Sequence, residues 1–578
     1  MSTQPSEFPH KAGRAQQAGG VLAIAKVAGN LALASGVTIA LLFGMVLALC
    51  SALLLIVKSG NPALGLGIAL VITIAFNAIA FFVSPWIMDL VQNWLYHTKW
   101  VSIEELERRS PESAHVIRRV CSLKKIKQPR IGIIDDQNPT AFTYGALPDS
   151  ARLVVSAGLF TYLDDDEVAT VYAHELGHIV HWDFAVMTMA STLIQIMYLI
   201  YIGVREVGRK LDDKAESAAA VVAMTAYVFY LVGTYLLLYL SRTREYFADH
   251  FAAETTGNPN ALSRALVKIA YGILEESEKA KEPSRLIQGT RALGIYDAKA
   301  AVSTGSSYRI SSQPEKVGRV FLWDLFNPWG WWLELSSTHP LTGKRVRALS
   351  NYAEQLGLDM EFDMGRVIAE GNQLSKQRLY GSFFTDLLFY CAEFLAIVVG
   401  LIVGAILAHG GMNAGKAFVA IPLLCLGIAL LVKRTVMFPS SKNAPTSDIM
   451  TLMSDPYASP LRGKPVTLKG KVIGRGDAGY VFGSDMKLQD QTGMIYLLYA
   501  SRWGPIGNFL AGMNKVKDLI GTQTTTKGWF RRGVAPWMDL ELITTDSGKK
   551  HSSHPAFWSL VGGIICLAIA ALLLVAKF

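Results

Sequence analysis

The sequence predicts a multi-span α-helical membrane protein that also carries a mostly helical α+β domain and a small C-terminal β-barrel. Apolar residues make up 51% of the 578 residues and charged residues only 17%, whereas an average soluble chain is about 25% charged. Seven stretches are long and apolar enough to cross a bilayer, which takes about 20 residues. Near the C-terminus, short alternating segments separated by turn residues indicate β-structure.

The candidate spans follow a polar N-terminal tail over residues 1–30, in which we expect no cleavable signal peptide. They run near Leu31–Val57, Ala63–Leu90, Ala185–Val204, Ala218–Leu240, Phe383–Ala408, Ala417–Val432 and Ala556–Ala576. The third contains several hydroxyl side chains and Gln195, and the sixth is short. Whether the segments near 185–204 and 218–240 cross fully is therefore left open.

Basic residues predict which side of the membrane each loop faces, because cytoplasmic loops are enriched in Lys and Arg. The hairpin between the first two spans has only Lys58, whereas the segment after the second span is rich in basic residues between Lys99 and Lys127. That segment and the N-terminus should be cytoplasmic. The loop between the third and fourth spans argues against this scheme, because it contains Arg205, Arg209 and nearby lysines.

The regions outside the spans divide the chain further. A domain over residues 95–380 contains the two inserted spans (about 185–240), two spans follow within 381–433, and a β-rich region occupies 434–550 before the last span at 556–576. Within the first domain, Val101–Val120 is typical of a helix, and Arg130–Asp135 and Ala151–Ser156 of short strands. A tryptophan cluster at 323–332 fits either the membrane–water interface or a local core.

Five short strands in the β-rich region suggest a small barrel of the OB type. They are Val466–Gly474, Met486–Gln489, Met494–Tyr499, Thr522–Trp529 and Trp537–Thr544. Basic residues and tryptophans there could suit nucleic acid. Because the region lies between two membrane spans, we instead expect contact with a protein or with lipid headgroups. The five cysteines are far apart and indicate neither a disulfide framework nor a cysteine metal site.

The segment His174-Glu175-Leu176-Gly177-His178 carries the chemistry. Residues at i and i+4 share one helix face, so both imidazoles can reach one ion. Chance would produce this pattern roughly 0.01 times in a chain of this composition. Glu175 cannot easily be a ligand at that spacing, but it can act as a general base toward water activated by the metal. The alternative is a pair of surface histidines without a metal.

A catalytic zinc site normally has three protein ligands. One helix can hardly aim His181 at the same ion as His174 and His178, so we interpret it as exposed or as a neighbour of the site. Glu245 is the better candidate, on a helix that we expect to begin at Ser241 directly after the fourth span. Asp249, one turn later, can accept a hydrogen bond from a ligand imidazole. The alternative for Glu245 is a salt bridge with a neighbouring arginine.

Several blocks resemble the HtpX-like and CAAX-prenyl-protease-like family of membrane zinc metallopeptidases. They are Val155–Leu159, Asp166–Val168, His174–His178 with Asp183, Ser241–Asp249, and Ser337–Pro340 with Arg345. The resemblance implies a zincin-like protease domain, with one Zn²⁺ per chain held by His174, His178 and Glu245. It further implies Glu175 as the base, His339 as a helper that stabilises the oxyanion, and Arg345 as a salt-bridge partner.

The family match also covers Asn138–Phe142, which resembles an edge strand that runs beside the substrate, although Pro139 and Thr140 depart from the family pattern. We expect a membrane-embedded zinc endopeptidase that hydrolyses membrane or misfolded proteins, in a bacterial inner membrane with its active site on the cytoplasmic side. The alternatives are a prenyl-protein-type protease and a non-catalytic scaffold or chaperone. A transporter is disfavoured, because the spans contain few polar residues.

Overall fold

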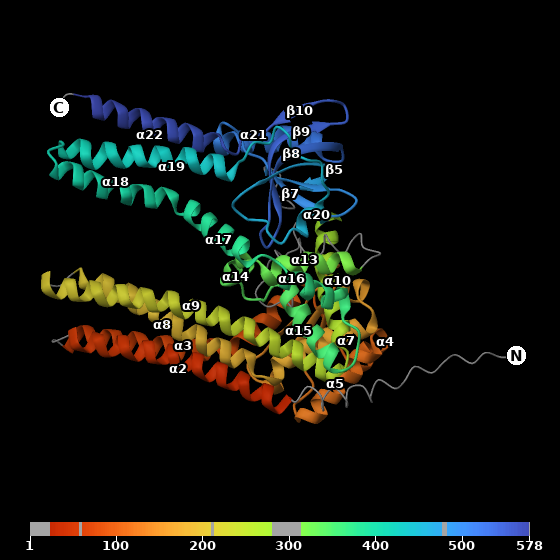
Figure 1. The fold of residues 1–578 in the computed structure, drawn as a ribbon. Helices are drawn as coiled ribbons and strands as arrows, with labels where there is room; N and C mark the ends of the chain where they lie inside the picture. Colours follow the sequence, from red (N-terminus) through yellow and green to blue (C-terminus); the bar gives the residue numbers. More distant parts are fainter. Residues whose placement is uncertain (1–23, 57–59, 210–212, 280–313, 477–482, 577–578) are drawn as a thin grey trace. The chain divides into compact units, whose positions relative to one another are not determined.

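The computed structural model describes residues 24–56, 60–209, 213–279, 314–476 and 483–576 (Figure 1). The chain forms two compact units. The first contains the described residues of Met1–Gly272 and Glu334–Glu361, and the second contains those of Ile273–Ser284, Ala298–Leu333 and Phe362–Phe578. Residues 1–23 of the predicted N-terminal tail lie outside the described residues, and the first helix begins at Ile24, earlier than expected.

Four long helices of the first unit lie side by side (Figure 1). They are α2 (Ile24–Ile56), α3 (Gly60–Trp94), α8 (Asp183–Gly208) and α9 (Asp213–Thr256). Even α8, with 26 residues, is about 39 Å long at 1.5 Å per residue, which exceeds the 30 Å of a hydrocarbon core. Apolar side chains cover their outer surfaces. All seven predicted spans coincide with helices that are long and apolar enough to cross a membrane.

Helix α9 corrects one expectation about the candidate ligand Glu245. No new helix begins at Ser241, because α9 continues without a break from Asp213 to Thr256 over 44 residues. The sequence between Leu240 and Arg244 contains no glycine or proline, so nothing interrupts helix propagation there. The same rigid element therefore includes the fourth candidate span and the residues that reach the site.

The first unit also contains a four-stranded sheet. It contains β1 (Lys99–Val101), β2 (Arg130–Ile134), β3 (Ala141–Tyr144) and β4 (Arg152–Ser156), in the order β1-β2-β4-β3. Strands β2 and β4 pair in parallel, and β3 pairs with β4 antiparallel. The two predicted strands are confirmed, and the segment after Asn138 forms β3 at the edge of the sheet.

The prediction of a single helix over Val101–Val120 is wrong in one respect. The structure has two helices there, α4 (Ile103–Arg109) and α5 (Pro111–Lys124). Ser110 is extended between them and accepts a hydrogen bond from the amide of Ser113. Proline at the first position of α5 has no amide hydrogen to continue α4, which explains the break.

Helix α7 (Asp165–Val180) lies between the sheet and α9. Its N-terminus is capped, since the carboxylate of Glu167 accepts from the amide of Asp164 at 3.0 Å. Gly177 permits a close helix–helix approach, because a Cβ atom there would lie 3.1 Å from the Cα of Ala248 on α9. Helices α6 (Ala157–Tyr162) and α15 (Thr342–Gln355), and the part of α10 (Pro259–Lys279) up to Gly272, also belong to this unit.

The second unit contains the other three candidate spans, α18 (Ala392–His409), α19 (Ile421–Met437) and α22 (Phe557–Val575). The predicted fifth span, Phe383–Ala408, is interrupted at Cys391, where α17 (Lys376–Tyr390) ends. Short helices α13 (Pro314–Phe326), α14 (Pro328–Glu334) and α16 (Met364–Asn372) precede them. In the tryptophan cluster, Trp323 and Trp329 are buried as core residues, whereas Trp331 and Trp332 are exposed.

The β-rich region forms a closed five-stranded ring. Its strands are β5 (Lys464–Arg475), β6 (Met486–Gln489), β7 (Met494–Leu498), β8 (Gln523–Arg531) and β9 (Trp537–Thr545). They pair in the order β9-β7-β6-β5-β8, and β8 closes the ring on β9. The five predicted strands are thus confirmed, while the OB type stays a prediction. Helices α20 (Ile449–Met453) and α21 (Gly504–Leu519) and strand β10 (Lys550–Ser552) were not expected.

Candidate metal centre

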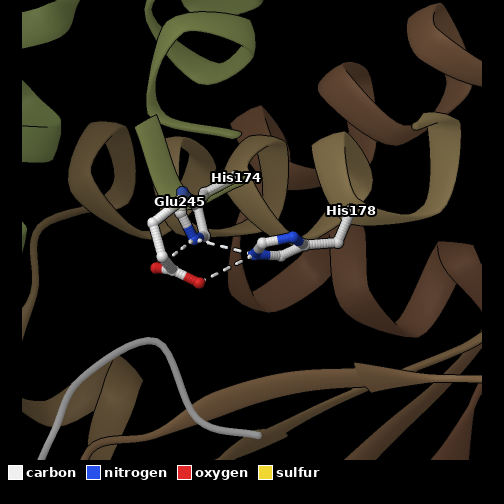
Figure 2. A group of neighbouring side chains, drawn as sticks. All are labelled: His174, His178 and Glu245. Atoms are coloured by element: carbon white, nitrogen blue, oxygen red, sulfur yellow. Dashed lines mark hydrogen bonds and ion pairs between the residues drawn. The ribbon is translucent and has the colours of Figure 1, made fainter. Parts of the chain in front are cut away.

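Two histidines of α7 and a glutamate of α9 face one another in the first unit (Figure 2). The Nε2 atoms of His174 and His178 are 3.2 Å apart. The carboxylate of Glu245 lies 3.7 Å from Nε2 of His174 and 3.6 Å from Nε2 of His178. Among the described residues, these three form the group whose potential ligand atoms all lie within 4.8 Å of one another.

The other ring nitrogen of each histidine lies within 3.0 Å of a carboxylate. Nδ1 of His174 is 3.0 Å from Asp249, and Nδ1 of His178 is 2.6 Å from Asp183. A carboxylate at Nδ1 keeps the proton there, so the Nε2 lone pair of each ring faces the shared point. Zinc–nitrogen bonds of about 2.0–2.1 Å at a tetrahedral angle hold two nitrogens about 3.3 Å apart. The two imidazoles are therefore already spaced for one zinc ion.

Arg345 of α15 neutralises the acidic side of this group. Its Nε and Nη2 atoms donate to the two carboxylate oxygens of Asp249 at 2.8 and 2.6 Å. Its Nη1 atom lies 3.2 Å from Glu245. All three side chains are buried, and buried carboxylates are costly unless they are paired. Arg345 thus fixes both carboxylates, and Asp249 in turn orients His174.

Asp183 is the orienting residue to which the sequence interpretation gave no role. It begins α8, directly after Trp182, whose φ of 61° turns the chain sharply back from the end of α7. Arg244 of α9 forms a buried ion pair with it and donates to the backbone carbonyl of His181 at 2.9 Å. The one signal in the sequence was its place in the block that resembles the metallopeptidase family.

Neither alternative ligand arrangement is present. His181 lies outside the group, and its ring contacts Phe251 at 5.7 Å between centroids. Burial lowers the pKa of His181 to about 4, so it is neutral at pH 7. Arg242 donates to backbone carbonyls of the 334–337 loop, and Arg244 binds Asp183. The alternative in which Glu245 pairs with one of these arginines is therefore not observed.

Glu175 lies on α7 next to the group, buried against the edge strand. Thr143, on β3, lies beside its carboxylate. Its Oε2 atom has no hydrogen-bond partner among the described residues. Burial raises the pKa of the Glu175 carboxyl, and the neighbouring His178 and His174 offset part of this rise. The carboxylate thus has a free oxygen close to the two histidines.

His339 approaches from the loop before α15. Its Nε2 atom is 3.7 Å from the carboxylate of Glu245, and its Nδ1 atom is 3.0 Å from the hydroxyl of Thr338. Helix α9 holds this loop, because Ser241 donates to the carbonyl of Thr338 at 2.9 Å and Arg242 to that of Ser337 at 2.8 Å. All the site residues predicted from the sequence are therefore brought together.

A cleft of about 480 Å³ reaches two members of the group, His178 and Glu245. Edge strand β3 and the residue after it, Gly145, form one wall, and α9 with the 338–339 loop forms the floor near His178 and Glu245. The remaining wall comes from two candidate spans, α3 and α8. Those span residues are Ser84, Pro85, Met88, Asp183, Phe184, Met187, Thr188 and Ser191. The cleft therefore runs from the candidate metal ligands into the helix bundle.

Comparison with known proteins shows which families and proteins this chain is similar to. Residues 107–353 match the profile of peptidase family M48. The protease HtpX homologue of Methanothermobacter thermautotrophicus is 29% identical over 253 residues, which cover 43% of this chain and 89% of that protein. The protease HtpX homologue of Nostoc punctiforme is 30% identical over 298 residues, covering 50% and 88%.

The solved structure of Ste24p from S. mikatae is 15% identical, covers 57% of this chain and 66% of that chain, and has a TM-score of 0.31. The protease HtpX homologue of Acidiphilium cryptum is 33% identical over 207 residues, which cover 36% of this chain and 71% of that protein. With this identity and coverage, together with the matching family profile, the chain belongs to peptidase family M48, a family of zinc metallopeptidases.

Proposed function

We propose that this protein is a membrane-embedded zinc endopeptidase with one Zn²⁺ held by His174, His178 and Glu245. The observation that carries the proposal is the pair of Nε2 atoms 3.2 Å apart, each on a ring whose Nδ1 lies within 3.0 Å of a carboxylate. Bound zinc supplies a Lewis acid that polarises the scissile carbonyl and acidifies water. The side chains of the site transfer the protons and stabilise the oxyanion.

Glu175 is the proposed proton carrier. Its free Oε2 atom can accept the proton of the attacking water, and Thr143 lies beside the carboxylate. The same carboxyl group then donates that proton to the nitrogen of the leaving amine. Positioned acid–base groups of this kind contribute about 10²–10⁴-fold to a rate.

His339 is proposed to stabilise the oxyanion of the tetrahedral intermediate. Its Nε2 atom faces Glu245, and Thr338 at Nδ1 fixes the orientation of the ring. An N–H held in place before the reaction stabilises developing charge without reorganisation. The contacts of Ser241 and Arg242 with this loop supply that rigidity.

The walls of the cleft support an extended peptide as the substrate. Strand β3 is hydrogen-bonded to β4 on one side only, so its other edge offers main-chain donors and acceptors. Main-chain pairing of this kind tolerates many sequences, which suits unfolded segments. Because α3 and α8 form the other wall, we propose that substrates include membrane proteins, cleaved at the cytoplasmic face of a bacterial inner membrane.

The alternatives predict different substrates. A prenyl-protein-type protease would cleave a farnesylated peptide that ends in a CaaX sequence, and a scaffold would cleave nothing. We would incubate the zinc-loaded protein in nanodiscs with casein and, separately, with such a peptide, using Glu175→Gln as the blank. Cleavage of casein by the wild type alone supports the proposal. Cleavage of the farnesylated peptide only, or of neither substrate, would overturn it.

A further inference from the structure

Helix α21 (Gly504–Leu519), which joins β7 to β8, has its apolar side chains arranged in an unusual way. The residues that it buries in its first three turns are small: Gly507, Ala511 and Gly512. The large apolar side chains at the start of the helix face outward instead. Their exposed fractions are 81% for Trp503, 72% for Ile506, 44% for Phe509, 53% for Leu510 and 38% for Met513.

These five side chains form a stripe on one face of the helix. Their spacing of three and four residues places them within one sector along more than two turns. In a water-soluble protein a helix turns its large apolar residues toward the core, and exposed patches of this kind mark interaction sites. The outward face of α21 is therefore built to be covered.

The start of α21 is attached to the start of a membrane span in the same unit. The amide of Ala500 donates to the hydroxyl of Ser553 at 2.9 Å, and its carbonyl accepts from the amide of His554 at 2.7 Å. Three residues later α22 begins, at Phe557. A Cβ atom on Gly504 would lie 3.7 Å from the indole nitrogen of Trp558. Figure 1 shows α21 beside this end of α22.

A second span, α19, ends close to the start of α22. Arg434, near the C-terminus of α19, donates to the carbonyl of Ala556 at 3.3 Å, and the hydroxyl of Ser559 donates to the carbonyl of Leu430 at 3.1 Å. Arg434 and Trp558, which is exposed, thus lie at the shared end of the two spans. Arginine and tryptophan are typical of the membrane–water boundary.

The charges around the stripe fit an anionic membrane surface. Arg502, Lys515 and Lys517 are exposed on or beside α21, and Asp518 is the one exposed acid of the helix. We propose that α21 lies in the boundary between headgroups and acyl chains, with the stripe from Trp503 to Met513 in the lipid and its basic residues near anionic headgroups. The inference is independent of the proposed proteolytic function.

The test measures the depth of single probes in the full-length protein. The five native cysteines are replaced by alanine, and Leu510→Cys or Ile506→Cys is labelled with an environment-sensitive fluorophore in nanodiscs that contain phosphatidylglycerol. Asp518→Cys, exposed on the same helix but off the stripe, is the matched control. Each probe is exposed to aqueous iodide and, separately, to lipids with a nitroxide near the headgroup end of the acyl chain.

We expect the probes at 506 and 510 to emit at shorter wavelength, to be quenched by the nitroxide lipids and to be protected from iodide. The probe at 518 should show the opposite pattern. Equal iodide quenching at 510 and 518 would overturn the proposal, because the stripe would then face water. Protection from both quenchers would overturn it as well, because a protein surface, and not lipid, would then cover the stripe.

Discussion

Removal of the carboxylate of Asp183 tests whether the contacts behind the histidines set the metal affinity. This carboxylate lies 2.6 Å from Nδ1 of His178 and forms a buried ion pair with Arg244. In Asp183→Ala, His178 loses the partner that keeps its proton on Nδ1, and its ring becomes free to rotate away from Glu245. Zinc binding should weaken, although all three proposed ligands remain.

The size of the effect follows from the contact. A hydrogen bond to a charged partner contributes about 1.5–3 kcal/mol, and each 1.4 kcal/mol is a factor of about ten in affinity. We therefore expect a loss of about 10–100-fold, the range observed when carboxylates behind metal-bound histidines are removed. Asp183→Asn, which keeps an acceptor oxygen but not the charge, should lie between the wild type and alanine.

The assay is competition for zinc with a chelator of known affinity, in detergent, alongside thermal unfolding. Glu167→Gln is the matched control, because this buried acid on α7 pairs with Arg264 and Lys268 and touches no histidine. It should lower stability without changing zinc affinity. Zinc affinity equal to the wild type in Asp183→Ala, or an equal loss in both variants, would show that Asp183 does not set the metal affinity through His178.

Three further predictions concern stability and packing. Arg345→Met should destabilise the apo-protein by about 3–5 kcal/mol, since it leaves Asp249 buried without a counter-charge. Thermal unfolding measures the loss, and a variant as stable as the wild type would contradict this prediction. Gly177→Val should force α7 away from Ala248, lower the free energy of unfolding by about 1–3 kcal/mol and weaken zinc binding, which chelator competition measures. Unchanged zinc affinity would show that the helices adapt to the larger side chain. The pKa of His181 is about 4 in the folded protein and 6.5 in the unfolded chain, so the free energy of unfolding should be at its full value above pH 6.5 and fall by about 3 kcal/mol as the pH drops to 4. His181→Phe should reduce this fall. An unchanged pH profile in that variant would show that His181 is not the group responsible.

The local parts of the site could be predicted from the sequence. The pattern from His174 to His178 fixes one helix face whatever the rest of the chain does, and apolar length alone identifies the spans. Glu245 is some 70 residues further on, and its assignment needed an argument about membrane crossings and a family resemblance. The structure brings it to the two histidines on a continuous helix.

Asp183 shows why the remaining contacts could not be predicted. Its position depends on a left-handed backbone conformation at Trp182, which no residue preference indicates. Helix α21 was missed for another reason, because glycine, proline and asparagine near its start obscure its periodicity. The position of Asp183 also depends on its ion pair with Arg244 of α9, which is far from it in the sequence.

The most direct test of the proposed zinc endopeptidase compares zinc content and casein cleavage in the purified wild type and in Glu175→Gln. We expect one zinc ion per chain in both proteins and cleavage by the wild type only, because Glu175 moves protons and does not hold the metal. Thermal unfolding confirms that both proteins are folded. A wild type that binds no zinc would show that the three residues are not metal ligands, and a Glu175→Gln variant that cleaves as fast as the wild type would show that Glu175 is not the general base.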